Sequence, residues 1–331
     1  MARILLTQAI HPQAQARLAE LGEVIVAPDT RAETLRACAV GCDVVMVRAQ
    51  LPDDIFASAS SLVGAVRHGA GVDMIPIDEA TARGVLVANV PGVNANAVAE
   101  HVLRSLLQLA RFSGPIALRL QARSAGWGKA RAFADAGFEL RGRTLGLVGF
   151  GHVGRAIGKL CAAGLSMNVL AHTRSPLAAG DSPALRVPLP DLLAQSDFVV
   201  LACPLTDDTR GLIGAAELAS MKRGAFLVNV ARGPVVQEAA LIDALQSGRL
   251  AGAALDVFDT IPLRDDHPYW ALENVLITPH VAGITDDSMR RMGEGAARAV
   301  ASLLRGELPP HCINPQALPA FLRRFGAGSG S

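Results

Sequence analysis

The sequence lacks an excess of charge of either sign. Its 31 lysines and arginines are balanced by 30 aspartates and glutamates, which leaves a net charge of +1 at pH 7. A protein that holds nucleic acid needs a basic surface facing the phosphates, and this composition provides none. No block of like charges marks an extended tail either. We therefore expect no nucleic-acid partner.

Cysteine is scarce, and long apolar runs are absent. Five cysteines are scattered along the chain, and Cys38 and Cys42, spaced like neighbours on a helix, have no second Cys/His cluster to complete a zinc site. We expect reduced core thiols in a cytoplasmic protein and no bound metal. No stretch reaches the roughly 18 uncharged apolar residues of a membrane helix. The apolar run in residues 1–7 is too short for a signal peptide, so no membrane partner is expected.

The composition and patterning indicate an α/β protein of two domains. Half of the 331 residues are hydrophobic and 18% are charged, which suits globular domains with full cores. Short apolar segments alternate with helical patterns from residue 3 to about 90 and again after residue 154, as in parallel, doubly wound sheets. Between these blocks, residues 95–111 are apolar around most of a helix. This helix is expected to cross between the domains or to pack against a partner subunit.

Residues 145–154 form the most informative stretch, Leu-Gly-Leu-Val-Gly-Phe-Gly-His-Val-Gly. A short apolar strand runs into a Gly-x-Gly-x-x-Gly turn and the start of a helix. The first glycine allows the tight turn, the second lets a pyrophosphate approach the backbone, and the third lets the helix pack against the strand. The match alone would be weak in a chain with 32 glycines. Because a strand precedes it and an amphipathic helix follows, it favours a dinucleotide site over a turn without a ligand.

Three polar residues follow the ends of three separate predicted strands in the second block. They are Arg232, Asp256 and His280. A parallel sheet binds its ligand beyond the carboxyl ends of its strands, near the point where the strand order reverses. We therefore expect these side chains to converge on one edge of the sheet, beside the glycine turn.

About 20 residues past the turn, NAD-binding sheets usually carry an acidic residue that binds the ribose hydroxyls. Here the strand ends in His-Thr-Arg-Ser, residues 172–175, with no acid. An arginine with neighbouring hydroxyls would accept a 2′-phosphate, whereas a carboxylate would repel it. The sequence therefore predicts NADP(H) as the preferred cofactor, with NAD(H) as the second choice. The alternative is that Arg174 stacks on adenine in an enzyme of loose preference.

Over almost its whole length the chain resembles the D-2-hydroxyacid dehydrogenase family. Besides the glycine turn, the matching stretches are His68–Asp73, Asn89–Gly92, Asn94–Glu100, Leu140–Gly146, Cys203–Thr206, Asn229–Gly233, Leu255–Phe258 and Thr278–Gly283. The resemblance implies two doubly wound parallel-sheet domains with the active site in the cleft between them, and a homodimer built around the helix near residues 98–111. It implies a flavodoxin-like substrate-binding domain and a Rossmann dinucleotide-binding domain. The corresponding bounds are 1–97 with 286–322 for the first, 98–285 for the second, and 323–331 for a flexible tail.

The resemblance also implies roles for individual residues. Arg232 would bind the substrate carboxylate and polarise the carbonyl, since a guanidinium is permanently charged and binds a carboxylate bidentately. His280 would exchange a proton with the substrate oxygen, because histidine titrates near neutrality. The backbone N–H groups of Ala70 and Gly71 would hold the carboxylate. Arg48 stands where some relatives place a further substrate arginine, and a surface salt bridge is the alternative.

The remaining implied site residues bind the cofactor. They are Gly149, Gly151, His152, Val153, Gly154, Thr173, Arg174, Ser175, Cys203, Pro204, Thr209, Val230, Asp256, His280 and Gly283. Within this set, Asp256 and the backbone near Val230 would orient the nicotinamide carboxamide. Two other histidines, His68 and His101, are expected to be structural.

The chain departs from the family pattern at one important position. The family pairs its histidine with a glutamate just before a proline, and here Ile261 precedes Pro262. Isoleucine can neither raise the histidine pKa nor fix its tautomer. Three outcomes are open. Asp259, Asp265 or Asp266 takes the place of the glutamate, or the histidine works without an acidic partner. Otherwise the chain is a catalytically weak dinucleotide-binding regulator or sensor. We favour an enzyme that reduces a 2-oxo acid such as glyoxylate or hydroxypyruvate to the D-2-hydroxy acid.

Overall fold

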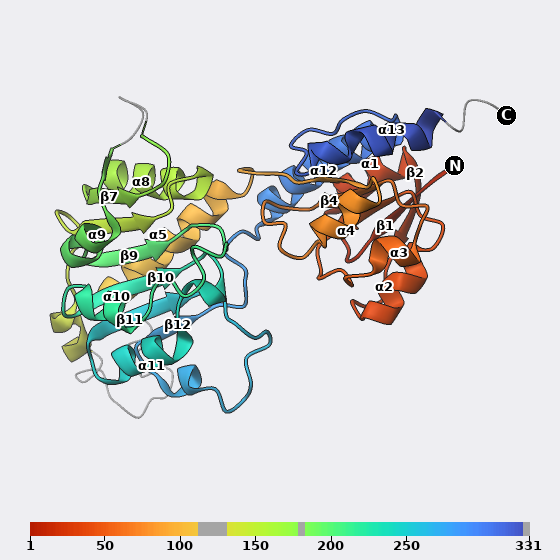
Figure 1. Ribbon diagram of the computed structural model, residues 1–331. Coiled ribbons are helices and arrows are strands. Elements are labelled where there is room, and N and C mark those ends of the chain that lie inside the picture. Colours follow the sequence, from red (N-terminus) through yellow and green to blue (C-terminus); the bar gives the residue numbers. More distant parts are fainter. Residues whose placement is uncertain (112–130, 178–182, 327–331) are drawn as a thin grey trace. The chain divides into compact units, whose positions relative to one another are not determined.

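The computed structural model describes residues 1–111, 131–177 and 183–326. They form two compact units (Figure 1). The first unit contains Met1–Asn94 and the segment from Ile284 onward, and the second contains Ala95–Gly283. The chain therefore leaves the first unit once and returns to it after completing the second. The bounds expected from the sequence, 97/98 and 285/286, stay predictions of where the functional domains divide.

The first unit is a five-stranded sheet with helices on both faces. Its strands are β1 (Ala2–Leu6), β2 (Gly22–Val26), β3 (Val44–Val47), β4 (Gly64–Arg67) and β5 (Leu86–Ala88). Its helices are α1 (Pro12–Ala19), α2 (Ala32–Ala39), α3 (Ile55–Ser58), α4 (Ile77–Ala82), α12 (Asp286–Leu304) and α13 (Leu318–Gly326). The order β2-β1-β3-β4-β5, with every neighbouring pair parallel, is that of a flavodoxin-like sheet.

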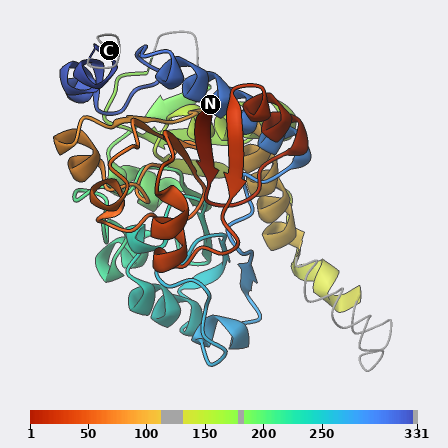
Figure 2. The same ribbon diagram turned by 90° about the vertical axis from the view of Figure 1, so that its right-hand side faces the viewer.

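Two cores lie on opposite faces of this sheet. Strand β3, which reads Val-Val-Met-Val, is buried on both faces, as parallel strands covered by helices are. Because side chains alternate along a strand, Met46 joins the core under α1, α12 and α13, and Val45 joins the core under α2, α3 and α4. Both views show α12, in blue, beside the red N-terminal elements (Figures 1 and 2), and Figure 1 shows α13 close to them as well. The end of the chain thus completes the core begun by its first residues.

The predicted flexible tail, residues 323–331, was wrong for residues 323–326, which belong to α13. Phe321 is fully buried and its ring lies 4.9 Å from that of Phe325. Arg324 donates a 2.6 Å hydrogen bond to the carbonyl of Leu62. The glycine- and serine-rich ending suggested disorder, but these aromatic and basic side chains keep the helix on the first unit. Residues 327–331 lie outside the described part of the chain.

The second unit is a seven-stranded parallel sheet. Its strands are β6 (Thr144–Val148), β7 (Asn168–His172), β8 (Ala184–Arg186), β9 (Phe198–Leu201), β10 (Ala225–Asn229), β11 (Leu250–Leu255) and β12 (Val275–Ile277). Its helices include α5 (Ala95–Arg111), α8 (His152–Leu165), α9 (Leu189–Gln195), α10 (Ala215–Ser220) and α11 (Glu238–Gln246). The order β12-β11-β10-β9-β6-β7-β8 extends a Rossmann sheet by one strand. The predicted fold class of two doubly wound parallel sheets is confirmed.

The strand order of the second unit reverses between β6 and β9, which pair with each other in parallel. This is the switch point where such sheets bind ligands. Helix α5 packs with α8 on one face, burying Val98, Val102, Leu106 and Leu109 in a shared core. The apolar character of residues 95–111 is thus used within the second unit. Packing of this helix against a partner subunit stays a prediction.

Within residues 1–111, 131–177 and 183–326, no helix is both long and apolar enough to cross a bilayer. The same residues hold no group of three or more His, Cys, Asp or Glu side chains placed to bind a metal ion.

Candidate active site

The glycine turn lies at the switch point, and its three glycines differ in what surrounds them. Gly149 has a φ of +96°, and a Cβ there would lie 2.6 Å from the backbone nitrogen of Cys203. A Cβ on Gly154 would lie 2.3 Å from the carbonyl oxygen of Gly149. The fold itself therefore requires these two glycines. A Cβ on Gly151 would meet no described atom within 4 Å, so that position leaves room for a ligand to approach the backbone.

The turn leads directly into the N-terminus of α8. Gly151 is the N-cap residue, and it has no side chain that could accept hydrogen bonds from the first N–H groups of the helix. The first turn, which begins with His152 and Val153, contains no acidic residue. A helix of 14 residues with a bare N-terminus offers free donors and the positive end of its dipole. Together with the open position at Gly151, this end of the helix fits the diphosphate of a dinucleotide.

The loop after β7 carries the residues predicted to select the cofactor. Thr173 is half-buried, and Arg174 and Ser175 are exposed. Arg186, from the neighbouring strand β8, donates from Nε to the carbonyl of Thr173 at 3.0 Å and from Nη2 to that of Arg174 at 3.2 Å. A second guanidinium therefore lies against this loop.

Sequence reasoning missed Arg186 because the short strand β8 was not recognised. The pairing of β7 with β8 places Ala171 opposite Arg186. The signal that could have revealed Arg186 is its position at the end of the strand that follows β7 in the sequence.

A second loop follows β9 on the other side of the switch point. It begins at Cys203, whose backbone lies against Gly149, and burial raises the pKa of the Cys203 thiol. The hydroxyl of Thr209 donates to the carbonyl of Pro204 at 2.7 Å and accepts from the backbone N–H of Thr206 at 2.8 Å. These bonds close the loop on itself beside the glycine turn.

Arg232 follows β10 in a loop held by its neighbours. The amide of Asn229 donates to the carbonyl of Arg232 at 3.0 Å and accepts from the N–H of Ala231 at 3.0 Å. The Arg232 guanidinium donates to the carbonyl of Ala231 at 2.7 Å. A Cβ on Gly233 would overlap the backbone of Phe258 at 2.1 Å, so only glycine fits there. The local sequence thus sets the path of the backbone on both sides of Arg232.

Asp256 follows β11 and is 2% exposed. One carboxylate oxygen accepts the hydroxyl of Thr278 at 2.6 Å and the N–H of Val281 at 2.9 Å, and the other accepts the N–H of Ala282 at 2.9 Å. The backbone N–H of His280 donates to the Asp256 carbonyl at 2.8 Å. Asp256 therefore shapes the loop that carries His280, and its predicted contact with the nicotinamide stays a prediction.

The sheet brings Arg232, Asp256 and His280 to the same edge. They follow β10, β11 and β12, which are adjacent and parallel. Asn229 pairs with Leu255, and Leu255 pairs with Ile277, so the three strands end level with one another. The convergence expected from the sequence follows from this register.

The acids considered as replacements for the missing glutamate have other neighbours. Burial and nearby Glu238 raise the pKa of Asp259, with Arg210 opposing them. Asp265 and Asp266 are exposed, and Asp266 lies 3.4 Å from Nε of Arg264. The residue at the glutamate position, Ile261, is 63% exposed.

In the first unit, the loop after β4 presents two backbone N–H groups. The Asn89 side chain donates to the carbonyl of Ala70 at 2.6 Å, and the N–H of Val90 donates to that of Gly69 at 2.8 Å. In a trans peptide the N–H points opposite to the C=O, so the N–H groups of Gly71 and Ala70 face away from these donors. The loop can therefore offer both N–H groups to an anion.

Two arginines lie near this loop. Arg67 donates to the carbonyls of Gly71 at 2.9 Å and Val47 at 2.8 Å. Arg48 is half-buried and donates to the carbonyl of Ala9, and burial lowers its pKa. Beneath the loop, burial lowers the pKa of His68 to about 4, with both cations contributing. Among the described residues, the Arg48 guanidinium donates to a backbone carbonyl, and its role toward the substrate stays a prediction.

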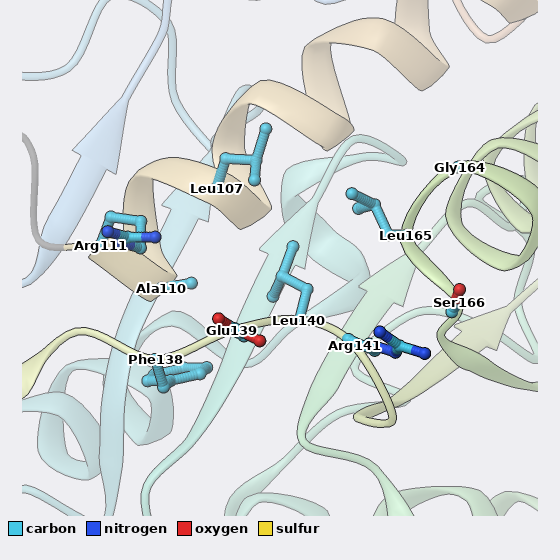
Figure 3. A pocket seen from close by; sticks show the side chains of 10 residues that line it. All are labelled: Leu107, Ala110, Arg111, Phe138, Glu139, Leu140, Arg141, Gly164, Leu165 and Ser166. Carbon is cyan, nitrogen blue, oxygen red and sulfur yellow. The ribbon is translucent and has the colours of Figure 1, made fainter.

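A pocket of about 500 Å³ lies elsewhere in the second unit. Figure 3 shows its lining from the ends of α5 and α8 and from residues 138–141. Residues 138–141 precede β6, and Ser166 precedes β7, so the pocket lies at the amino edge of the sheet. It is therefore not the site at the carboxyl edge.

Comparisons with known proteins agree with this geometry. The profile of the D-isomer specific 2-hydroxyacid dehydrogenase NAD-binding domain matches residues 103–282. A glyoxylate reductase of Pyrococcus furiosus is 38% identical over 83% of this chain and 82% of its own length. A crystal structure of a Thermus thermophilus protein superposes with a TM-score of 0.86 at 34% identity, covering 94% of this chain and 99% of that one.

A further crystal structure is that of an NADPH-dependent glyoxylate/hydroxypyruvate reductase from Sinorhizobium meliloti in complex with NADP and malonate. It superposes with a TM-score of 0.82 at 28% identity, covering 96% of this chain and 98% of that one.

Proposed function

Because the chain belongs to the D-2-hydroxyacid dehydrogenases, a family of NAD(P)-dependent oxidoreductases, we propose that it reduces a small 2-oxo acid to the D-2-hydroxy acid. Glyoxylate and hydroxypyruvate are the first candidates, since similar proteins carry those names. The observation that carries the proposal is the placement of Arg232 after β10 and His280 after β12, two strands that both pair with β11, at the edge where the glycine turn lies. A regulator without activity is not favoured, since these relatives are named as reductases.

Arg232 binds the substrate carboxylate and draws electron density from the carbonyl. A guanidinium offers paired donors in a fixed plane, which match the two oxygens of a carboxylate. Its backbone is held by Asn229 and by the close packing at Gly233, so the charge is delivered from a fixed loop. Ala70 and Gly71 supply backbone N–H donors for the same class of anion from the first unit, and Arg48 supplies a further charge.

His280 gives a proton to the substrate oxygen during reduction and takes it back during oxidation. The loop that carries it is fixed by Asp256, which accepts from Thr278 and from two backbone N–H groups. A fixed backbone limits the orientations that the imidazole can take relative to a bound substrate. The bound dinucleotide supplies the hydride.

NADP(H) is the proposed cofactor of choice. The loop after β7 carries Arg174 with Thr173 and Ser175, and no acidic residue lies within residues 171–177. The bond from Arg186 to the carbonyl of Arg174 holds the loop near a second cation. Two guanidinium groups favour a phosphate on the ribose over a free hydroxyl.

The test is a panel of 2-oxo acids, including glyoxylate and hydroxypyruvate, assayed with NADPH and NADH. We expect turnover with NADPH, a lower kcat/KM with NADH, and D-glycerate as the product from hydroxypyruvate. Binding of the dinucleotide without turnover of any acid would contradict the proposal and indicate a regulator. L-glycerate as product would contradict the proposed stereochemistry.

The proposal includes a cytoplasmic homodimer. Exposed Leu107 on α5, with a relative exposure of 43%, supports an apolar contact along this helix. Light scattering of the purified chain should give twice the 34.4 kDa mass of one chain. A mass of one chain would contradict it.

A further inference from the structure

We propose that His101 is a positioning residue for His280, acting through Thr278 and Asp256. The inference rests on the proposed acid/base role of His280. His101 lies on α5 and is partly buried, and its Nε2 is 3.4 Å from the hydroxyl oxygen of Thr278. The two residues are 177 positions apart in the sequence, so only the folded second unit brings them together.

The hydrogen bonds of Thr278 set the direction of this contact. The Thr278 hydroxyl donates to Oδ1 of Asp256 at 2.6 Å, so its oxygen faces His101 as an acceptor. His101 therefore donates from Nε2, in the tautomer that carries a proton on that nitrogen. A hydroxyl that both donates and accepts has a fixed orientation, which a hydroxyl with one partner lacks.

The chain of contacts ends at the backbone of the catalytic loop. Asp256 accepts the N–H of Val281 on the same oxygen as Thr278 and the N–H of Ala282 on its other oxygen, both at 2.9 Å. His280 itself has a φ of +56°, in the left-handed region of the backbone that residues other than glycine rarely adopt. A loop in this conformation needs bonds that hold it there. Asp256 supplies those bonds, and His101 holds Thr278 against Asp256.

Helix α5 makes a firm anchor for this contact. It is 17 residues long and buries one face in the core that it shares with α8. Burial lowers the pKa of His101, with Asp256 opposing the shift and Arg104 adding to it, which favours the neutral imidazole. A neutral donor can approach Asp256 without adding a charge near the acid/base histidine.

The test separates positioning from a general loss of stability. His101→Leu and Thr278→Val remove the contact, whereas His101→Gln and Thr278→Ser keep a donor and a hydroxyl. We expect the first pair to lower kcat about tenfold, the scale of a small misplacement of a catalytic group, with the Kd for NADPH within about twofold of wild type. The second pair should retain most of the kcat. Ser105→Ala is the matched control, because the Ser105 hydroxyl donates to the His101 carbonyl on the same helix.

His280→Ala is measured beside these variants. The inference is supported if His280→Ala and the first pair lose kcat while the conservative pair and Ser105→Ala do not. It is overturned if the first pair keeps wild-type kcat, or if all four substitutions at positions 101 and 278 lower kcat in step with Tm. Full activity in His280→Ala would instead overturn the proposed role of His280 itself.

Discussion

At the scale of single residues, the three glycines of the turn show how fold and ligand place separate demands on one motif. Gly149 and Gly154 are required by the backbone atoms around them, whereas Gly151 faces open space. A side chain at Gly151 would therefore obstruct only a ligand. The motif is thus partly structural and partly functional, residue by residue.

Gly151→Val should weaken NADPH binding at least about tenfold and leave Tm nearly unchanged, since no described atom lies within 4 Å of its Cβ. Gly154→Val is the contrasting variant, because its Cβ would overlap the Gly149 carbonyl and lower the stability. Calorimetric titration and thermal unfolding measure the two effects. Equal loss of Tm in both variants would show that Gly151 is structural.

Arg174 should determine the preference for NADPH. Arg174→Gln removes a charge-assisted bond worth about 1.5–3 kcal/mol, so we expect kcat/KM for NADPH to fall about tenfold to a hundredfold while that for NADH changes little. Arg223→Gln, at an exposed position before β10, is the control for loss of one positive charge. An equal fall with both cofactors would mean that Arg174 does not contact the phosphate.

Ile261→Glu restores the acid that the family carries at this position. An anion beside His280 raises the histidine pKa, and reduction needs the protonated form. The pH at which the reductive kcat/KM falls should therefore move upward by about one unit. The neutral Ile261→Gln is the matched control, and the 63% exposure of Ile261 makes both changes easy to accommodate. An unchanged pH profile in Ile261→Glu would mean that this position does not influence His280.

At the scale of secondary-structure elements, the alternation of strands and helices predicted both sheets. Parallel strands covered on both faces are short and apolar, and such runs are visible in a single sequence. The predicted edge positions of Arg232 and His280 followed from that pattern. Short β8 and amphipathic α13 escaped it, because one is three residues long and the other merges with a glycine- and serine-rich ending.

The contacts within the site were beyond sequence reasoning. Asp256 was predicted to orient the cofactor, but its bonds to Thr278, Val281 and Ala282 depend on the register of β11 against β12. His101 was expected to be structural, since nothing in its own segment indicates a partner 177 residues away. Side-chain contacts of this kind arise from packing that local patterns do not encode.

Burial of His68 beside helix α12 makes the stability of the first unit depend on pH. His68 follows β4 and is 3% exposed, and its Nε2 has no hydrogen-bond partner among the described residues. Its pKa of about 4 lies below the usual 6.5, so the unfolded chain binds more protons between these values. The unfolding free energy should therefore fall from pH 6.5 to pH 4, by roughly 3 kcal/mol at most.

His68→Asn tests this dependence, because it removes the titrating ring and keeps a donor near the Nδ1 position. Denaturant unfolding at several pH values should show a flatter profile for the variant than for wild type between pH 6.5 and 4. Identical slopes would assign the dependence to other groups. His11, a partly exposed histidine near the start of α1, gives the control variant His11→Asn.

At the scale of the whole molecule, the second unit is inserted between two parts of the first. The core of the first unit combines Leu6 with Val300 and Phe321, which lie on either side of the insertion in the sequence. The glycine turn, Arg232 and His280 all belong to the inserted unit, and the backbone N–H groups of Ala70 and Gly71 belong to the first. The proposed residues of hydride and proton transfer therefore all belong to one unit.

The rate of NADPH-dependent reduction of hydroxypyruvate, measured for wild type and His280→Ala, tests the central claim most directly. We predict steady turnover by wild type, and a kcat about 10²- to 10⁴-fold lower in His280→Ala with the Kd for NADPH unchanged. Other 2-oxo acids serve in its place if hydroxypyruvate is not the preferred substrate. Wild-type kcat in His280→Ala, or no turnover of any 2-oxo acid by the wild-type protein, would contradict the account.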